Sequence, residues 1–410
     1  MFKIAAVEGW KRVPKAGRVS LTLAAPALIA VLATGALRQP GARAASPFDL
    51  PKAALPIPPA NGEIGYVLTA FAPSIREGSD QCPHGLTFTL KEAYLETQPA
   101  AERERLLLKA NEVELERKWK AYAIGPNGTN ICSNADQFDR PSVKTVEARI
   151  APGMDLDGDA TGAAGDDTCS HENFTAPDGH QGVDNQAYRV LGCTVNWRNV
   201  DGKPGDYTEA LNDRLANGEH TMVFLLRGVN SFVNDDNVDV VFASSDDVAI
   251  TDTAKHILTN ASFTVGKNPR WRNVLHGRIV NGVLITDPAP EMHTSQKWGQ
   301  GGARGQRAEY DIRKGRFHLT FQPDGSLVGL MGGYQTIKTI MQSSMLGGAG
   351  AAVVAGIDCA GKYSTLRRLA DGIKDPATGK CTAVSSSWDV KAVPAFVFDR
   401  PPTKQNVAAK

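Results

Sequence analysis

Short runs of β-branched and aromatic residues, separated by turn-forming residues, recur from residue 144 onward and limit the folds open to this chain. Two of the separators, Asn281-Gly282 and Pro323-Asp324-Gly325, are strong signals for β-hairpins. Short strands joined by such turns at close spacing predict an antiparallel β-sandwich-like core. The runs that we expect to form its strands span 144–150, 221–229, 237–243, 278–286, 315–322 and 326–333.

Helical patterns flank this β-rich part. Residues 99–122 place apolar side chains at roughly helical spacing with charges between them, which predicts a helix that packs one face on a core. We therefore predict a mainly β fold with helical additions (α+β), in which an N-terminal helical segment and a C-terminal α/β tail flank the β-sandwich-like core. Further predicted elements are a strand at 63–73, helices at 207–217 and 363–370, and a strand at 390–398, which Pro394 marks as an edge strand.

The composition changes along the chain suggest six regions. We expect a signal peptide at 1–44, a linker at 45–62, an N-terminal α+β region at 63–143, an Asp-rich β domain at 144–260, a second β region at 261–345 and a C-terminal tail at 346–410.

The first 44 residues have the three parts of a cleavable signal peptide. Basic residues come first, an uncharged apolar run follows at 21–37, and Ala42-Arg43-Ala44 matches the A-x-A cleavage pattern. The alternative is an uncleaved anchor, although Pro26 interrupts the apolar run. No later segment is long and apolar enough to span a bilayer. We therefore predict an exported protein, periplasmic or extracellular, with no membrane span in the mature chain.

Removal of the signal peptide changes the charge of the protein. The whole chain has 45 basic and 44 acidic residues, whereas the part after residue 44 has 38 basic and 43 acidic residues. A mildly acidic protein has no general attraction for nucleic acid, so we expect no nucleic-acid partner.

Six cysteines lie in the predicted mature chain, and an even number in an exported protein favours disulfides. The alternative is buried free thiols. No C-x-x-C pair is present, so the sequence indicates neither a zinc ribbon nor a thioredoxin-type site. Pairing between neighbours in the sequence predicts the bridges Cys82–Cys132, Cys169–Cys193 and Cys359–Cys381.

The stretch from Gly153 to Cys193 contains the best candidate for a metal site. Carboxylates at alternate positions of a turning loop supply several of the about six to eight oxygen ligands that calcium binds. The loop does not match an EF-hand, because Ala160 occupies the position where the sharp turn needs glycine. The alternative is a solvated acidic turn. We predict a calcium site formed by Asp155, Asp157, Asp159, Asp166 and Asp167.

Two histidines lie near this acidic loop. His171 and His180 are of the residue type that binds transition metals, but we favour a supporting or surface role for both. A second acidic stretch around Asp235 and Asp236 is interpreted as a solvated loop, with the alternative that it completes a cation site with Asp155 and Asp157.

The order of motifs in this stretch resembles an uncharacterised family of exported bacterial proteins. The matching pattern is DLDGD, a Cys with a nearby His, PDG, GVDNQ and a further Cys, and similarity to the family covers most of 64–398. The family has no established activity, so the resemblance implies an exported, β-rich protein and no catalytic residue. We interpret GVDNQ, Gly182 to Gln186, as a structural segment that caps a helix or orients a loop.

Catalytic motifs are mostly absent. The chain contains neither G-x-S-x-G nor H-E-x-x-H, and Gly356–Lys362 departs from a phosphate loop because Tyr363 follows it where magnesium needs Ser or Thr. We therefore favour a non-enzymatic exported protein that binds a carbohydrate, an envelope component or another protein. The alternative is a secreted hydrolase or oxidoreductase accessory whose site is built from dispersed residues within 153–198.

Overall fold

A computed structural model describes residues 55–87, 89–138, 140, 143–298, 306–354 and 356–399. The predicted signal peptide at 1–44 and most of the predicted linker lie outside the described residues.

Eight antiparallel strands form a closed β-barrel. They follow one another around the barrel in chain order, and the last strand pairs with the first. The barrel strands are β1 (Ile64–Pro73), β2 (Thr221–Arg227), β3 (Asp235–Ser245), β5 (Arg272–Val280), β6 (Val283–Thr286), β8 (Gln306–Phe321), β9 (Leu327–Thr336) and β11 (Cys381–Phe398).

The predicted sandwich is therefore wrong, and one strand pair makes the difference. Gly65 of β1 pairs with Ala395 of β11, so the two ends of the sheet meet and no open edge remains between them. Hairpin signals and alternating side chains are the same in a sandwich and in a barrel. The pairing that closes the sheet joins opposite ends of the described chain and has no local signal.

Aromatic side chains fill the barrel. The ring centroids of Phe224, Phe242 and Phe317 lie 5.0–5.1 Å apart, and Phe71 stacks at 4.9 Å on Trp388 near one end. All five side chains are buried within the main core cluster. A small barrel whose inward positions carry large side chains has a packed interior, so this lumen is a core.

Three further strands lie on the barrel wall. β4 (Ser262–Thr264) pairs in parallel with the end of β11 and contributes Phe263 to an apolar cluster with Val67 and Val241. β7 (Ala289–Trp298) pairs with the first half of β8, and β10 (Gly372–Lys374) forms a hairpin with the start of β11.

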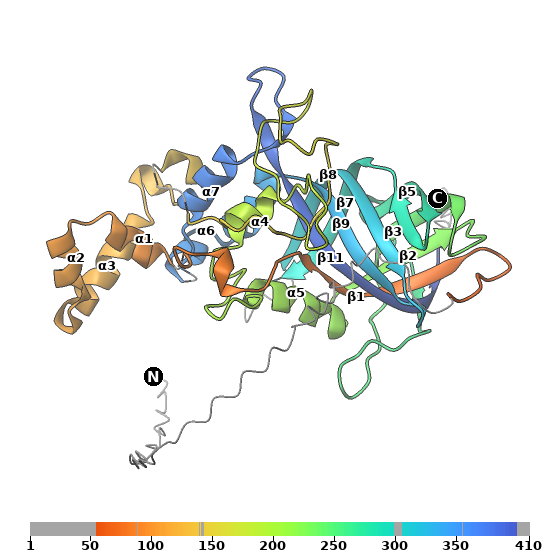
Figure 1. Ribbon diagram of the computed structural model, residues 1–410. Coiled ribbons are helices and arrows are strands. Elements are labelled where there is room, and N and C mark those ends of the chain that lie inside the picture. Colours follow the sequence, from red (N-terminus) through yellow and green to blue (C-terminus); the bar gives the residue numbers. More distant parts are fainter. Residues whose placement is uncertain are drawn as a thin grey trace, which may run out of the picture. The chain divides into compact units, whose positions relative to one another are not determined.

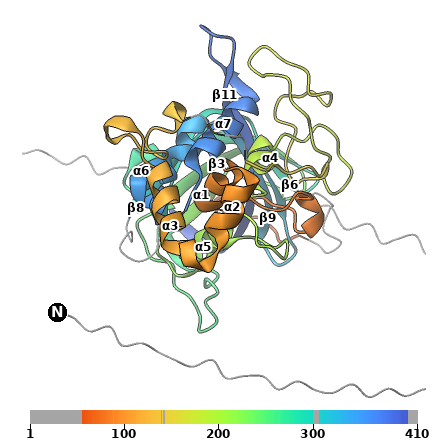
Figure 2. The same ribbon diagram turned by 90° about the vertical axis from the view of Figure 1, so that its left-hand side faces the viewer.

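The helices gather at one end of the barrel (Figure 1). Figure 2, turned by 90°, shows them in front of the barrel, with α1, α2 and α3 nearest the viewer. The helices are α1 (Leu90–Glu96), α2 (Ala100–Leu107), α3 (Glu112–Tyr122), α4 (Gln186–Leu191), α5 (Asp206–Ala216), α6 (Ile337–Val353) and α7 (Cys359–Arg368). Short 3-10 turns occupy Ser79–Gln81, Lys109–Asn111, Pro126–Gly128, Ala135–Gln137 and Pro269–Trp271.

Several local predictions are confirmed. Asn281 and Gly282 both have positive φ and join paired residues Val280 and Val283, as a two-residue hairpin turn requires. The Pro323–Gly325 turn likewise joins β8 to β9. The helix expected at 207–217 is α5.

Other local predictions are wrong. The single helix expected at 99–122 is divided into α2 and α3 by a 3-10 turn. Residues 144–150 form no ladder and make only the bridge of Ile150 to Thr175. The strand expected at an edge belongs to β11, which pairs with β1 on one side and with β9 on the other. Pro394 lies beyond Ala392, the last residue of β11 that pairs with β9.

All six cysteines form disulfides, but the predicted neighbour pairing is wrong. The bridges join Cys82 to Cys193, Cys132 to Cys359 and Cys169 to Cys381, across 111, 227 and 212 residues respectively. The fold explains the third pair, since the Cys169 N–H donates to the carbonyl of Asp371 beside β10. Pairing thus follows contacts between distant segments, which spacing along the chain does not reveal.

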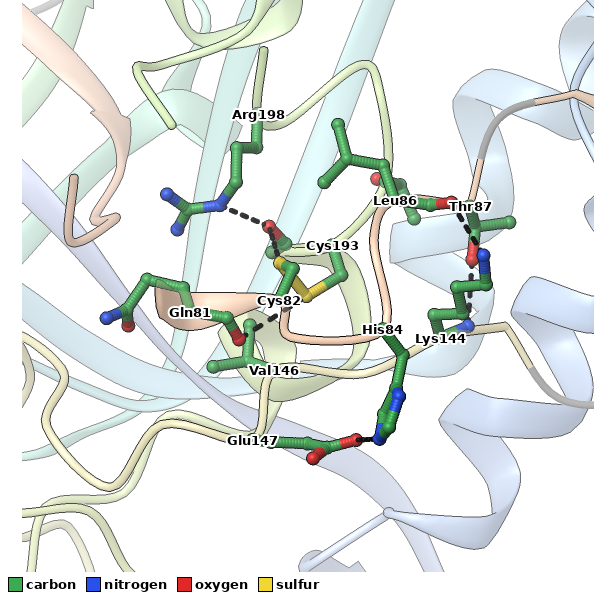
Figure 3. Close-up of a disulfide and its surroundings, with 12 residues drawn as sticks. Gln81, Cys82, His84, Leu86, Thr87, Lys144, Val146, Glu147, Cys193 and Arg198 are labelled. Atoms are coloured by element: carbon green, nitrogen blue, oxygen red, sulfur yellow. Dashed lines mark hydrogen bonds and ion pairs between the residues drawn. A yellow bond between two sulfur atoms is a disulfide. The ribbon is translucent and has the colours of Figure 1, made fainter. Parts of the chain in front are cut away.

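The Cys82–Cys193 bridge lies beside a buried guanidinium (Figure 3). Arg198 is 1% exposed and donates to the carbonyl oxygens of Gly192, Gly202 and Arg76 at 2.7–2.8 Å. Because these carbonyls belong to separate loops, one side chain and one disulfide hold the loops between the barrel and the helices together.

Within the described part of the chain, no helix has the length and apolar character needed to cross a bilayer. The three disulfides are compatible with the predicted export.

The disulfide pattern leads to a direct prediction. Non-reducing peptide mapping of the mature protein should recover the three long-range bridges. Replacing Cys169 and Cys381 together by Ser should lower the free energy of unfolding by about 2–5 kcal/mol, because it releases a long loop in the unfolded chain. Urea unfolding measures this loss. Recovery of peptides that join Cys169 to Cys193 would contradict the fold described here.

Candidate metal centre

The acidic segment that precedes α4 folds back on itself and lies against the outside of the barrel. The N–H of Asp184 donates to the carbonyl of Met154, and single bridges join Ile150 to Thr175 and Phe174 to Val183. Its apolar side chains contact the wall formed by β9 and β11. This contact cluster contains Met154, Leu156, Leu330, Tyr334 and Ala383.

Three side chains of this segment converge. One ligand atom from each of Asp157, His171 and Asp184 lies within 4.8 Å of the other two. His171 and Asp184 have side chains that are 4% and 0% exposed, and Asp157 is partly buried. Two carboxylates and an imidazole at this separation can share one metal ion.

Hydrogen bonds orient each of the three side chains. The carboxylate of Asp184 accepts from the N–H of Leu156 at 2.7 Å, and that of Asp157 accepts from the N–H of Asp159 at 2.8 Å. Nδ1 of His171 lies 2.9 Å from the carbonyl oxygen of Cys169, so Nδ1 carries a proton. Nε2 is left to face Asp184 at 2.7 Å. A Nδ1–H bond to a backbone carbonyl is the usual support of a histidine that binds a metal through Nε2.

The other face of the cluster is built from the barrel and from the turn before β10. Asp371 is fully buried, and its carboxylate accepts from the N–H of Ser385 on β11. Tyr334 of β9 is 1% exposed, and Arg316 of β8 donates to the carbonyl of Leu156 at 2.8 Å. The second carboxylate oxygens of Asp157 and Asp371 and the hydroxyl of Tyr334 are buried without a hydrogen-bond partner among the described residues.

Burial and close charge pairs shift the pKa values of the cluster. Burial raises the pKa of Asp157, and the nearby carboxylate of Asp184 adds to the shift. Burial raises the pKa of Asp371 to about 7. Burial alone would lower the pKa of His171, but its hydrogen bonds to Asp184 and to the Cys169 carbonyl outweigh burial and raise the pKa to about 9. At neutral pH His171 is therefore protonated beside Asp184, and a metal ion bound at Nε2 would take the place of that proton.

Only one of the five acidic residues predicted as metal ligands belongs to this set, namely Asp157. Asp155 accepts from the N–H of Gly158, and Asp159 accepts from the N–H groups of Thr161 and Ala163. These contacts shape the loop.

The remaining two acidic residues of the prediction lie further along the loop. Asp167 accepts from the N–H of Lys374 and pairs with Lys314 at 2.9 Å, while Asp166 is exposed. The structure thus places Asp157 with His171 and Asp184, which the prediction did not include.

The sequence contains a partial signal for both His171 and Asp184. GVDNQ predicts a helix cap or a loop-orienting segment, and Asn185 does accept from the N–H of Tyr188 at the start of α4. Asp184, one residue earlier, is turned toward Asp157 and His171. His171 lies beside Cys169, and the bridge to Cys381 fixes its position against the barrel. His180 is exposed and lies outside the cluster.

A second group of possible ligands, Glu291, His293 and Asp311, lies on β7 and β8. Guanidinium groups already neutralise it, because Arg313 pairs with Glu291 at 2.9 Å and Arg270 lies 3.6 Å from Asp311. It is also more exposed than the first group. We interpret it as a surface ion-pair network.

The close contact between β10 and the barrel wall can be tested by substitution. A Cβ atom at Gly372 would lie 2.1 Å from the ring of the buried Tyr334, so Gly372→Ala should lower the free energy of unfolding by about 1–3 kcal/mol. Gly350→Ala in α6 is the matched control, since its Cβ would meet open space. That variant should be neutral or stabilised by up to about 1 kcal/mol. Equal denaturation midpoints for both variants would contradict this packing.

No family model matches the chain, and no similar curated protein or solved structure was found for it. The resemblance to an uncharacterised exported family therefore stays a prediction.

Proposed function

We propose that this chain is an exported metal-binding protein in which Asp157, His171 and Asp184 hold a divalent transition-metal ion. The observation that carries the proposal is the buried carboxylate oxygen of Asp157, which has no hydrogen-bond partner in the described structure and lies beside an oriented His–Asp pair. An unpaired buried carboxylate oxygen costs folding free energy, and a cation in this position would remove that cost.

The donor set favours a transition metal over the predicted calcium. Calcium binds oxygen ligands almost exclusively, whereas an imidazole nitrogen with carboxylates suits zinc, manganese or iron. Calcium remains the alternative, since carboxylates supply two of the three ligand residues. Competition between metal ions in one assay decides between the two.

The burial of the ligands supports a structural role for the metal. Catalytic metal sites keep an open position for substrate, and structural sites are closed. His171 and Asp184 are almost completely shielded from solvent. Both ends of the acidic segment would be joined by the ion, because Asp157 lies near its start and Asp184 directly before α4. In this proposal the ion holds the segment on the barrel, as the Cys169–Cys381 bridge does nearby.

A closed structural site fits a non-enzymatic protein better than a hydrolase or an oxidoreductase accessory. Both interpretations stay predictions.

The proposal predicts one bound metal ion per chain. Mature protein freed of metal by a chelator should take up one equivalent of zinc or manganese in a titration followed by calorimetry. The variants His171→Gln and Asp157→Asn should bind more than about 100-fold more weakly, since even supporting residues cost about 10–100-fold in affinity. Asp166→Asn is the control, because it makes the same change in the same loop on an exposed side chain outside the set.

Thermal unfolding supplies the second measurement. A metal at 100 times its Kd should stabilise the native protein by about 2.7 kcal/mol and raise Tm, and this gain should be lost in His171→Gln and kept in Asp166→Asn. If neither zinc, manganese nor calcium raises Tm, His171 and Asp184 form only an ion pair and the proposal is wrong. A rise with calcium alone would favour the oxygen-ligand alternative.

A further inference from the structure

A cavity of about 380 Å³ lies where the helices meet the end of the barrel. Its floor is the last layer of the barrel interior, which includes Tyr310, Gln335 and Trp388. Its walls come from α4, α5, α6 and the start of α7. The volume falls in the range of small-molecule sites, and the position at a barrel mouth is a common one for them. The cavity is separate from the metal cluster, since none of the three ligand residues lines it.

One cation projects into this cavity without a partner. Lys362 lies in the first turns of α7, lines the cavity and is partly buried. Its ammonium makes no hydrogen bond or ion pair to any described residue. Burial lowers the pKa of Lys362 to about 8, as expected for a charge that is removed from water and left without a counter-ion.

Further hydrogen-bond donors surround the same space. Trp388 is 2% exposed, and its indole N–H has no hydrogen-bond partner among the described atoms. The hydroxyls of Tyr207 and Tyr310 lie 2.8 Å apart, so one donates to the other and leaves a single hydroxyl hydrogen free. The lining thus carries three donors without an acceptor, namely the Lys362 ammonium, the Trp388 indole N–H and one tyrosine hydroxyl. A ligand group that only accepts hydrogen bonds would satisfy all three.

The two carboxylates on the lining do not neutralise Lys362. Asp358 caps α7 by accepting from the N–H of Gly361 at 3.0 Å, and burial raises its pKa. Asp206, the other carboxylate, lies at the start of α5. Arg214 of the same helix also lines the cavity, but its guanidinium pairs with Glu219. Neither carboxylate is paired with the ammonium, which leaves a place for an external anion.

The remaining lining is apolar in large part, with polar side chains such as Asn196, Thr339 and Ser344 between the apolar ones. It includes Trp197, whose ring stacks on Tyr207 at 6.1 Å, together with Leu191, Ile340 and Ile357. A ligand that fits must therefore combine one anionic group with an apolar body. A single unpaired ammonium matches a monoanion better than a phosphate dianion, which needs more positive charge.

We propose that this cavity binds a small organic carboxylate with an apolar or aromatic body, whose carboxylate pairs with Lys362 and accepts from the unpartnered donors of Trp388 and the Tyr207–Tyr310 pair. This site goes beyond the proposed metal binding and does not depend on it.

The test uses phenylacetate and hexanoate as probes, with phenylacetamide as the neutral match and inorganic phosphate as the anion without a body. Binding to the mature protein is followed by calorimetry and by tryptophan fluorescence, because Trp197 and Trp388 line the cavity. We expect at least one carboxylate to bind and phenylacetamide and phosphate to bind at least 10-fold more weakly.

Variants locate the binding. Lys362→Met should weaken the carboxylate by more than 10-fold and leave phenylacetamide unchanged, and Tyr310→Phe should weaken the carboxylate by a smaller factor. Lys338→Met is the control, because Lys338 is an exposed lysine of α6 that does not line this cavity. An unchanged Tm in each variant shows that it folds. The proposal is overturned if neither carboxylate binds, if phenylacetamide binds as tightly as phenylacetate, or if Lys362→Met binds like the parent protein.

Discussion

The pairing of β11 with β1 closes the barrel and fixes the wall and the barrel end on which the outer segments and the helices pack. β11 also pairs with β9, β10 and β4, so a single 18-residue strand joins the wall, the hairpin and the outer strand. Cys381 at its start anchors the acidic segment through Cys169. Further along, Ser385 donates its N–H to Asp371 and Trp388 closes the barrel end below the cavity. Both proposed sites therefore rest on opposite faces of one strand.

The outward face of this strand carries the candidate metal centre. Packing of Met154 and Leu156 on the wall brings Asp157 toward His171 and Asp184, and burial then removes water from their carboxylates. The apolar packing stabilises the fold, whereas the burial of the carboxylates destabilises it unless a cation compensates their charge. The inward face leads to the aromatic core and to the cavity, where the unpaired charge is the ammonium of Lys362. The proposed ligands of the two sites therefore have opposite charge: a metal cation for the acidic cluster and a carboxylate anion for the cavity.

Local features of this fold were predictable from the sequence, and long-range ones were not. Asn281-Gly282 demands positive φ at two successive residues, and GVDNQ supplies the cap of α4; both signals lie within a few residues of their effect. The closure of the barrel and the partner of Cys169 depend on segments that are far apart in the sequence. Alternating carboxylates are visible in the sequence, and for this reason the predicted ligand set includes Asp157. For His171 the sequence favours a supporting role, and for Asp184 it gives no ligand signal, because only the fold of the loop turns both toward Asp157.

The proposed function requires that Asp157, His171 and Asp184 share one metal ion. X-ray absorption spectroscopy of the zinc-loaded mature protein tests it most directly, because imidazole ligands give a characteristic outer-shell scattering pattern. We expect a first shell of nitrogen and oxygen at about 2.0–2.2 Å with scattering from one imidazole, and loss of that imidazole signal in His171→Gln. A shell of oxygen alone in the parent protein, or an imidazole signal that survives the substitution, would contradict it.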